Sequence, residues 1–331
     1  MQSSIFDIIF TSDLQHYGGN MEKTFFYAAA AMITVLLATA CDISGNFQQR
    51  ITTSAPVELK FLADGPEKAA YFEAPAANRN LEKYEIWYPE RMLTAKQEKF
   101  PVIIFCNGTG CKASFYQNIF RHLATWGFIA VGTEETMSGK GKGASDCLDF
   151  MIASNNDPQS IFFNKIDLNN AGIAGHSQGG AGAFNGASKF KNSGHFKALF
   201  AISGVNRQLA EDSFLQSPYE PSLIRIPVMM TSTSKPDGWD VYWPGSKEPG
   251  ICNLQSMLEN RKEIRSNGNI PVVIAVTSDK NSGHADSLWE SEPYLAAWFS
   301  YWLKGDKEAG NFFLGNDAEL LTNPRWQNVV L

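Results

Sequence analysis

The residues Gly175, Ser177 and Gly179 form a Gly-x-Ser-x-Gly pattern, which is typical of a nucleophilic serine on a sharp turn between a strand and a helix. The positions two before and two after such a serine need very small residues, because larger side chains would collide across the turn. The N-terminus of the following helix presents unpaired N–H groups that can stabilise an oxyanion. The alternative for this segment is an ordinary glycine-rich turn.

The segments on either side of Ser177 favour the catalytic interpretation. Residues 171–174 are small and apolar, as in a buried strand, and residues 179–189 are rich in Ala and Gly, as in a helix packed closely on a sheet. Strand, turn and helix therefore follow one another in the order that the chemistry requires. The sequence predicts Ser177 as a nucleophile.

A nucleophilic serine needs a base that accepts its proton, and the base needs an acid that orients it. Among the five histidines, His284 is the predicted base, because it follows the last strand of the predicted sheet. His16 lies in the N-terminal segment, and His122 is predicted to be a surface or partly buried helical residue. The side chain of His176 is expected to point away from that of the adjacent serine, and His195 precedes a strand, at the wrong end of the sheet.

The acid is expected after the strand that precedes the histidine, and Asp237 follows the strand predicted at residues 226–231. Asp240 stands close behind and is the alternative. Both aspartates also suit a simple Pro-Asp-Gly turn. The choice between the two stays open at this point.

The oxyanion hole is predicted from two backbone N–H groups. One belongs to Gln178, directly after the serine, and the other to Thr109, in the small and turn-prone loop of residues 107–110. The alternative for this loop is an ordinary turn between a strand and a helix.

Apolar segments of strand length alternate with helical segments along most of the chain. Alternation of this kind, after an antiparallel start, predicts an α/β fold with a mostly parallel, doubly wound sheet flanked by helices. The active site of such a sheet lies at the carboxyl ends of its strands. The expected strands are residues 53–63, 84–88, 101–106, 127–131, 171–174, 198–202, 226–231 and 270–276, and the expected helices include 115–126, 146–153, 253–266 and 288–303.

The composition is that of an ordinary globular protein and indicates no nucleic-acid partner. The chain has 331 residues, of which 44% are hydrophobic and 19% charged, with a formal net charge of −6 and no cluster of Lys and Arg. No cysteine spacing indicates a metal site. Cys111 and Cys147 lie near loops that flank the predicted site and are a candidate disulfide pair in an oxidising compartment.

The N-terminal segment predicts export. Residues 25–40 are almost wholly apolar, with a length that suits the core of a signal peptide, and translation starting at Met21 would remove the acidic residues before it. Ala38-Thr-Ala40 fits a cleavage site. The same letters resemble a bacterial lipobox with Cys41 as the lipid attachment residue, although the leucine stands four rather than three residues before it. The alternative is a buried or membrane-spanning helix.

Three domains are expected along the chain. Residues 1–40 form an N-terminal extension and signal peptide, residues 41–74 a linker and first strand, and residues 75–331 the catalytic domain. The expected location is outside the cytoplasm, either secreted, periplasmic or tethered to a membrane through a lipid on Cys41, and the expected state is a monomer.

The segments 106–116, 123–131 and 175–180 resemble chlorophyllases and the bacterial chlorophyllase-like, dienelactone-hydrolase-like and cutinase-like polyester hydrolases. The resemblance covers residues 75–330. It implies a compact α/β-hydrolase without a large cap domain that cleaves carboxylic esters with no metal or organic cofactor. By this resemblance the site residues match the catalytic triad Ser177, Asp237 and His284 and the oxyanion donors Thr109 and Gln178.

The chain also departs from these families. Asn107 stands where a histidine often precedes the oxyanion glycine, and the residues around the serine, His176 and Gln178, are closer to chlorophyllase-like members than to polyester hydrolases. The predicted activity is that of an exported serine esterase acting on a small or polymeric ester. The alternatives are a peptidase of the same fold and a lipoprotein that binds a ligand without turnover. Aromatic residues expected to line the substrate pocket, or to serve in ordinary packing, are Phe115, Tyr116, Trp239 and Trp243.

Overall fold

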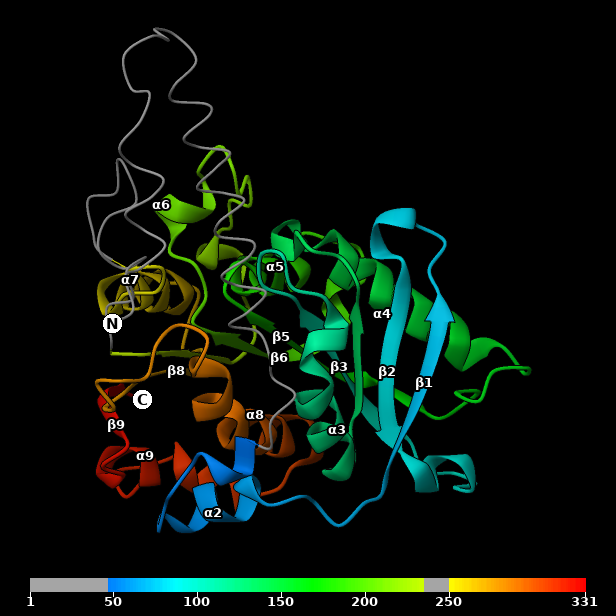
Figure 1. Ribbon diagram of the computed structural model, residues 1–331, viewed down its shortest axis with the longest axis horizontal. Helices are drawn as coiled ribbons and strands as arrows, with labels where there is room; N and C mark the ends of the chain where they lie inside the picture. The colour runs from blue at the N-terminus through cyan, green and yellow to red at the C-terminus, as the bar shows by residue number, and fades with distance from the viewer. Residues whose placement is uncertain (1–46, 235–249) are drawn as a thin grey trace, which may run out of the picture.

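The structure is a computed structural model, and it describes residues 47–234 and 250–331. Within this described part, one nine-stranded sheet runs through the molecule in the order β1-β2-β4-β3-β5-β6-β7-β8-β9 (Figure 1). The strands are β1 (Ala69–Pro75), β2 (Lys83–Pro89), β3 (Phe100–Cys106), β4 (Ile129–Thr133), β5 (Ile166–His176), β6 (Phe196–Ile202), β7 (Val228–Ser232), β8 (Val272–Thr277) and β9 (Trp326–Val330).

The central part of the sheet is parallel. Every neighbouring pair from β4 through β3, β5, β6 and β7 to β8 is parallel, whereas β1, β2 and β4 pair antiparallel at one edge and β8 and β9 at the other. The predicted mostly parallel sheet of an α/β fold is confirmed. Because parallel strands end at the same edge of a sheet, the segments that follow β3, β5 and β8 are brought together there.

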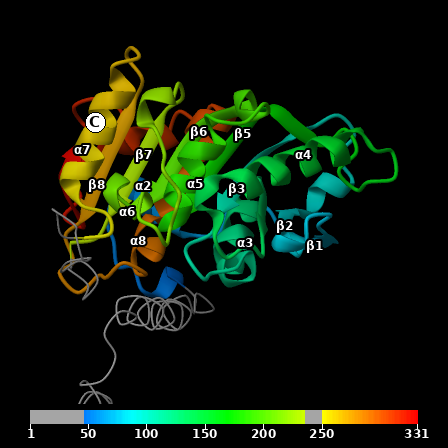
Figure 2. The ribbon, with the colours of Figure 1, turned by 90° about the horizontal axis from the view of Figure 1, so that it is seen from above.

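Helices cover both faces of the sheet (Figures 1 and 2). One face carries α2, α3 and α8, and the other carries α4, α5 and α7, with a separate apolar core on each side. The helices of these two layers, together with two short ones, are α2 (Pro56–Leu62), α3 (Gln117–Thr125), α4 (Lys142–Asn156), α5 (Gln178–Gly186), α6 (Arg207–Ala210), α7 (Leu254–Arg265), α8 (Ser287–Lys304) and α9 (Glu319–Thr322).

The strand β3 illustrates why the apolar segments of this sequence form central strands. All seven of its residues are buried. Ile103 and Phe105 face the core under α3 and α8, whereas Val102 and Ile104 face the core under α4. A strand covered on both faces therefore needs a continuous apolar sequence rather than an alternating one.

The strand expected at residues 53–63 is wrong, because this segment contains the helix α2. Pro56 stands at the first position of the helix, where the missing N–H of a proline costs nothing. Val57 and Phe61 are buried against α8. Residues four apart share one face of a helix, and they also share one face of a strand, so the pattern of this short segment suits both structures.

The two edge strands β1 and β9 were not among the expected strands. β1 pairs with β2 and β9 with β8, both antiparallel, so each is held by a single neighbour in the described sheet. β1 mixes half-buried and exposed residues, and β9 has one buried residue, Trp326, followed by exposed and half-buried ones, so neither strand is an apolar run. The sequence pattern of each edge strand is weak, and pairing with the neighbouring strand of the sheet stabilises it.

The expected pairing of Cys111 with Cys147 is wrong. Cys111 is disulfide-bonded, whereas Cys147 is a buried free thiol on α4. Burial raises the pKa of the Cys147 thiol well above its ordinary value, with smaller contributions from the nearby Cys106 and acidic groups. The predicted signal peptide and Cys41 lie outside the described residues. Within residues 47–234 and 250–331, no helix is both long enough and apolar enough to span a membrane.

Candidate active site

Ser177 sits in a strained turn between β5 and α5. Its backbone angles are φ 57° and ψ −125°, a conformation that is rare for a residue with a side chain. A Cβ atom on Gly175 would lie 1.9 Å from the carbonyl oxygen of Gly179, and a Cβ atom on Gly179 would lie 2.1 Å from that of Cys106. Both glycines are therefore required for the turn to close against the end of β3.

Backbone hydrogen bonds hold this strained turn in place. The N–H of Ser177 donates to the carbonyl of Ile202 at 3.0 Å, and the Ser177 carbonyl accepts from the N–H groups of Gly180 at 2.9 Å and Val205 at 3.1 Å. The turn is thus tied to the end of β6 as well as to its own helix. A local sequence pattern and a neighbouring strand together fix the backbone of the predicted nucleophile.

The loop after β3 lies directly against Ser177. A Cβ atom on Gly108 would lie 3.3 Å from the Cβ atom of Ser177 and 3.1 Å from Nδ1 of His176. Only a glycine lets the backbone approach the turn this closely without displacing its neighbours. The structure therefore brings the predicted oxyanion loop and the predicted nucleophile together.

The N–H groups on either side of Thr109 are used within the protein. Gly108 donates to Oη of Tyr116 at 3.0 Å, and Gly110 donates to the carbonyl of Thr136 at 2.8 Å. Neither bond uses the N–H of Thr109 itself. The loop is held by its flanking residues, which leaves the Thr109 N–H as the donor that sequence reasoning assigns to the oxyanion hole.

Asn107 fixes the start of the same loop. Its buried side-chain Nδ2 donates to the carbonyls of Thr133 at 2.6 Å and Glu135 at 2.8 Å, beyond the end of β4. Its own carbonyl accepts from Oγ of Ser138 at 2.6 Å. Sequence reasoning noted Asn107 only as a departure from a related family, because a pairing between two strand ends has no local signal.

Gln178, the other predicted oxyanion donor, is the first residue of α5. The first N–H groups of a helix have no intrahelical partner, so they are available to a ligand. The side chain of Gln178 turns into the protein, where its Nε2 lies 3.3 Å from Oγ of Ser217 and 3.4 Å from the carbonyl of Leu215. The backbone of Gln178, rather than its side chain, is thus suited to the site.

His284 lies beyond the end of β8 and packs on the residue that precedes Ser177. The ring of His284 stacks on the ring of His176, with 5.0 Å between the ring centroids and 29° between the ring planes. Both histidines are buried. Burial lowers the pKa of His284 to about 4, so its imidazole is neutral near pH 7 and can accept a proton.

Sequence reasoning gave His176 no role in the site. Its side chain was expected to point away from that of Ser177, and its ring contacts the oxyanion loop on one hand and the ring of His284 on the other. Burial lowers the pKa of His176 well below its ordinary value, and the neighbouring His284 lowers it further. A histidine next to the nucleophile has no sequence signal that distinguishes this arrangement from an outward-facing side chain.

The remaining predicted site residues divide into two groups. Tyr116 is fully buried and packs against Phe105 with 4.7 Å between the ring centroids, and Phe115 is half-buried against the same core. The others lie outside the described residues: Asp237, Asp240, Trp239 and Trp243.

The expectation that His122 lies at the surface or is only partly buried is wrong. The His122 side chain is completely buried, and its Nδ1 forms an ion pair with the buried carboxylate of Glu292 on α8. Its Nε2 lies 2.9 Å from the carbonyl of Ala63. His195 lies before β6, with its Nδ1 2.8 Å from the carbonyl of Leu168.

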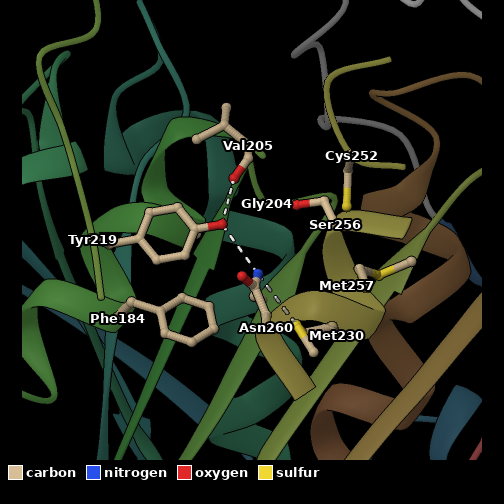
Figure 3. Close-up of a pocket in the computed structure, with 11 residues that line it drawn as sticks. Phe184, Gly204, Val205, Tyr219, Met230, Cys252, Ser256, Met257 and Asn260 are labelled. Carbon is tan, nitrogen blue, oxygen red and sulfur yellow. Dashed lines mark hydrogen bonds between the residues drawn. The ribbon is translucent and has the colours of Figure 1, made fainter. Parts of the chain in front are cut away.

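A small pocket lies behind the turn, between α5 and α7 (Figure 3). It is partly open, and its lining is mostly apolar. Tyr219 donates its hydroxyl proton to the carbonyl of Val205 at 3.1 Å and accepts from Nδ2 of Asn260 at 3.1 Å (Figure 3). Since the N–H of Val205 binds the carbonyl of Ser177, this bond network supports the turn from behind.

No group of three His, Cys, Asp or Glu side chains in residues 47–234 and 250–331 is arranged to hold a metal ion. The chemical groups that the structure does bring together are a serine on a strained turn, a glycine-containing loop with backbone donors, and a neutral histidine.

Comparisons with known proteins match the part of the chain that contains Thr109 and Ser177. The chlorophyllase family model matches residues 86–215, from β2 to beyond α6. A chlorophyllase type 0 from Chenopodium album is 26% identical over 171 residues, which cover 46% of this chain and 49% of that protein. The chain thus spans about half the length of this curated relative. The family match contains Thr109 and Ser177 and ends before His284.

The fold and the matches together support an α/β-hydrolase that is similar to chlorophyllases. The sheet order and the sharp turn after the central strand β5 agree with the fold that the family match indicates. The predicted resemblance to chlorophyllase-like proteins and the predicted α/β-hydrolase fold are both confirmed.

Proposed function

We propose that the protein is a serine esterase that cleaves carboxylic esters through an acyl-enzyme intermediate. The proposal is supported by the strained backbone of Ser177, against which the Gly108 loop packs, and by the ring of His284, which stacks on the adjacent residue His176. The similarity to chlorophyllases points to ester hydrolysis at a general level. The observation that carries the proposal is the positive φ of Ser177, because strain of this kind persists where it serves function.

In the first step, Oγ of Ser177 attacks the carbonyl carbon of the ester, and Nε2 of His284 accepts the hydroxyl proton. The carbonyl oxygen becomes an oxyanion, which the N–H groups of Thr109 and Gln178 stabilise. The carbon–oxygen bond to the alcohol then breaks. The alcohol leaves with the proton from His284, and the acyl group remains on Ser177.

In the second step, water attacks the acyl-enzyme. His284 accepts a proton from the water, the second tetrahedral intermediate collapses, and Ser177 regains its proton from His284. The products are a carboxylic acid and the free enzyme. The orienting acid is assigned to Asp237, with Asp240 as the alternative, and both lie outside the described residues.

The experiment is labelling with a fluorophosphonate probe, together with turnover of p-nitrophenyl esters of increasing acyl length. Wild-type protein is expected to be labelled and to hydrolyse at least one ester. Ser177→Ala should lose both activities while keeping its circular dichroism spectrum. Ser188→Ala, just beyond α5, is the matched control and should retain both. Labelling that persists in Ser177→Ala would rule out this nucleophile.

The ester panel also separates the alternatives. A peptidase of the same fold would hydrolyse peptide p-nitroanilides faster than esters of similar size. A lipoprotein that only binds a ligand would be folded, would not react with the probe and would turn over no ester. The panel should include aromatic and polymeric esters, because the acyl and alcohol groups of the substrate are the undefined part of the proposal.

We further propose that the protein is exported and cleaved after Ala40. The support is the apolar segment of residues 25–40 and the sequence that follows it. N-terminal sequencing of the protein recovered from outside the cytoplasm should begin at Cys41. Protein that stays in the cytoplasm with its N-terminal segment intact would contradict export.

A further inference from the structure

We propose that Tyr116 and His176 are positioning residues that connect the oxyanion loop to the catalytic base. The hydroxyl of Tyr116 bridges the N–H of Gly108 and Nδ1 of His176, and the ring of His176 in turn supports the ring of His284. The inference rests on the proposed esterase function. It assigns roles to two residues that the catalytic steps above do not use.

The geometry of the bridge is direct. The N–H of Gly108 donates to Oη of Tyr116 at 3.0 Å, and Oη lies 3.3 Å from Nδ1 of His176. Tyr116 is 0% exposed and His176 is 1% exposed. Because water does not reach these groups, the protein itself must satisfy them, and the loss of one partner leaves another buried polar group unsatisfied.

The chemistry of a phenol sets the direction of each bond. Oη of Tyr116 carries one proton, and it accepts the proton of the Gly108 amide, so its own proton is available to Nδ1 of His176. His176 is then a neutral imidazole with its proton on Nε2. Burial and, to a smaller extent, the charge of His284 lower the pKa of His176 against the opposite effect of a hydrogen bond with the His284 backbone, so the ring is neutral and one of its nitrogens can accept a proton.

The bridge joins three segments that are far apart in the chain. Gly108 follows β3, His176 ends β5, and His284 follows β8. Fixing the Gly108 N–H fixes the peptide plane that joins Asn107 to Gly108, directly before the peptide unit that carries the Thr109 N–H. The stack on His176 limits how the ring of His284 can tilt. The Tyr116 hydroxyl therefore helps to hold both the oxyanion loop and the ring of His284 in position relative to Ser177.

The first test is Tyr116→Phe, which removes the hydroxyl and keeps the ring that packs on Phe105. We expect kcat for p-nitrophenyl acetate to fall about tenfold to a hundredfold, with KM changed less than about twofold, because the lost interaction orients groups that act in the transition state. Inhibition by phenylboronic acid, which forms a tetrahedral adduct on serine, should weaken by a similar factor.

Tyr294→Phe is the matched control. Tyr294 is also buried, and its hydroxyl accepts a 2.7 Å hydrogen bond from Asn323, away from the site. This variant should lose stability but keep kcat and boronic acid affinity. An unchanged kcat in Tyr116→Phe, or an equal loss in both variants, would overturn the inference.

A double-mutant cycle tests whether the two residues act together. His176→Phe keeps a ring beside His284 but removes the acceptor of the Tyr116 hydroxyl. If both residues act through the same bridge, Tyr116→Phe/His176→Phe should lose no more kcat than the more severe single variant. Losses that multiply would show that the residues act independently and would contradict the bridge.

A measurement without turnover separates this inference from the proposed function. Nitrogen-15 NMR of histidine-labelled wild-type protein should show His176 as the neutral tautomer protonated on Nε2, and the Nδ1 signal should move in Tyr116→Phe. A tautomer protonated on Nδ1 would overturn the bridge even in an active esterase. Wild-type protein that reacts with no probe and no ester would instead contradict the proposed function, whatever the tautomer.

Discussion

Two buried histidine sites in this protein have opposite electrostatic environments. Between α3 and α8, burial disfavours the charged form of His122, but the charge and hydrogen bond of Glu292 outweigh burial and raise the pKa of His122. Behind the Ser177 turn, His176 and His284 stack on each other, and burial lowers the pKa of both. Burial alone therefore does not decide the charge of a histidine.

The two electrostatic environments suit a structural role for His122 and the proposed catalytic role for His284. The pair of His122 and Glu292 ties α3 to α8, and a charged, hydrogen-bonded pair suits that role. A catalytic base must be neutral before it accepts a proton, and the environment of His284 provides this. The following predictions separate a structural histidine from a catalytic one.

The largest expected effect is that of His284→Gln on catalysis. We expect kcat/KM to fall about 10⁴-fold, because the proposed acceptor of the serine proton is lost, while the free energy of unfolding changes little. Steady-state kinetics with a p-nitrophenyl ester and urea denaturation measure the two quantities. A residual activity near that of wild type would exclude His284 as the base.

Glu292→Gln should show the converse behaviour. Removing the carboxylate leaves a buried imidazole without its ionic partner, which we expect to cost about 3 kcal/mol of unfolding free energy with kcat/KM unchanged. The matched control is His122→Leu/Glu292→Met, which removes both polar groups and should be close to wild type in stability. A large loss of kcat/KM in folded Glu292→Gln would show that the two sites are coupled.

The two sites should also respond to pH in opposite directions. The folded-state pKa of His284 is about 4, below the ordinary value of 6.5, so the unfolded chain binds a proton first as the pH falls. The contribution of His284 to stability is complete above pH 6.5 and is lost as the pH falls toward 4, by about 3 kcal/mol. Thermal denaturation of wild type and His284→Gln should therefore give similar stabilities near pH 7 and diverge at acidic pH, where wild type becomes the less stable protein.

The pKa of His122 is raised, so its contribution has the opposite sign. It is complete below the ordinary value of 6.5 and is lost as the pH rises through the folded-state pKa. The stability difference between wild type and His122→Asn should thus be larger at pH 5.5 than at alkaline pH. The same sign of pH dependence for both histidine variants would contradict the comparison.

The smallest expected effect concerns the surroundings of His122. Nε1 of the half-buried Trp126 donates to the carbonyl of Ala63 at 3.1 Å and lies 3.3 Å from Nε2 of His122. Trp126→Phe should cost about 1 kcal/mol of stability, because one hydrogen bond is lost, and should leave kcat unchanged. Urea denaturation measures the first quantity, and a change in kcat would argue against a purely structural role for this region.

Strong local patterns made most of the central sheet predictable. Apolar runs such as that of β3 have few alternatives to a buried strand, and the parallel order follows from their alternation with helices. The helix α2 and the edge strands β1 and β9 were not predictable in the same way. Their short, mixed patterns suit more than one structure, and packing against α8, β2 and β8 decides between them.

The turn at Ser177 is the part of this protein that the amino-acid sequence determined by itself. The steric demand of Gly175, which faces the carbonyl of Gly179, acts within a few residues, so it can be read from neighbouring letters, whereas the demand of Gly179 comes from the end of β3. The surroundings of the histidines were decided only by the tertiary structure. The partners of His122 and His176 come from Glu292 and Tyr116, on segments distant in the chain, and such contacts set burial and charge without leaving a local pattern.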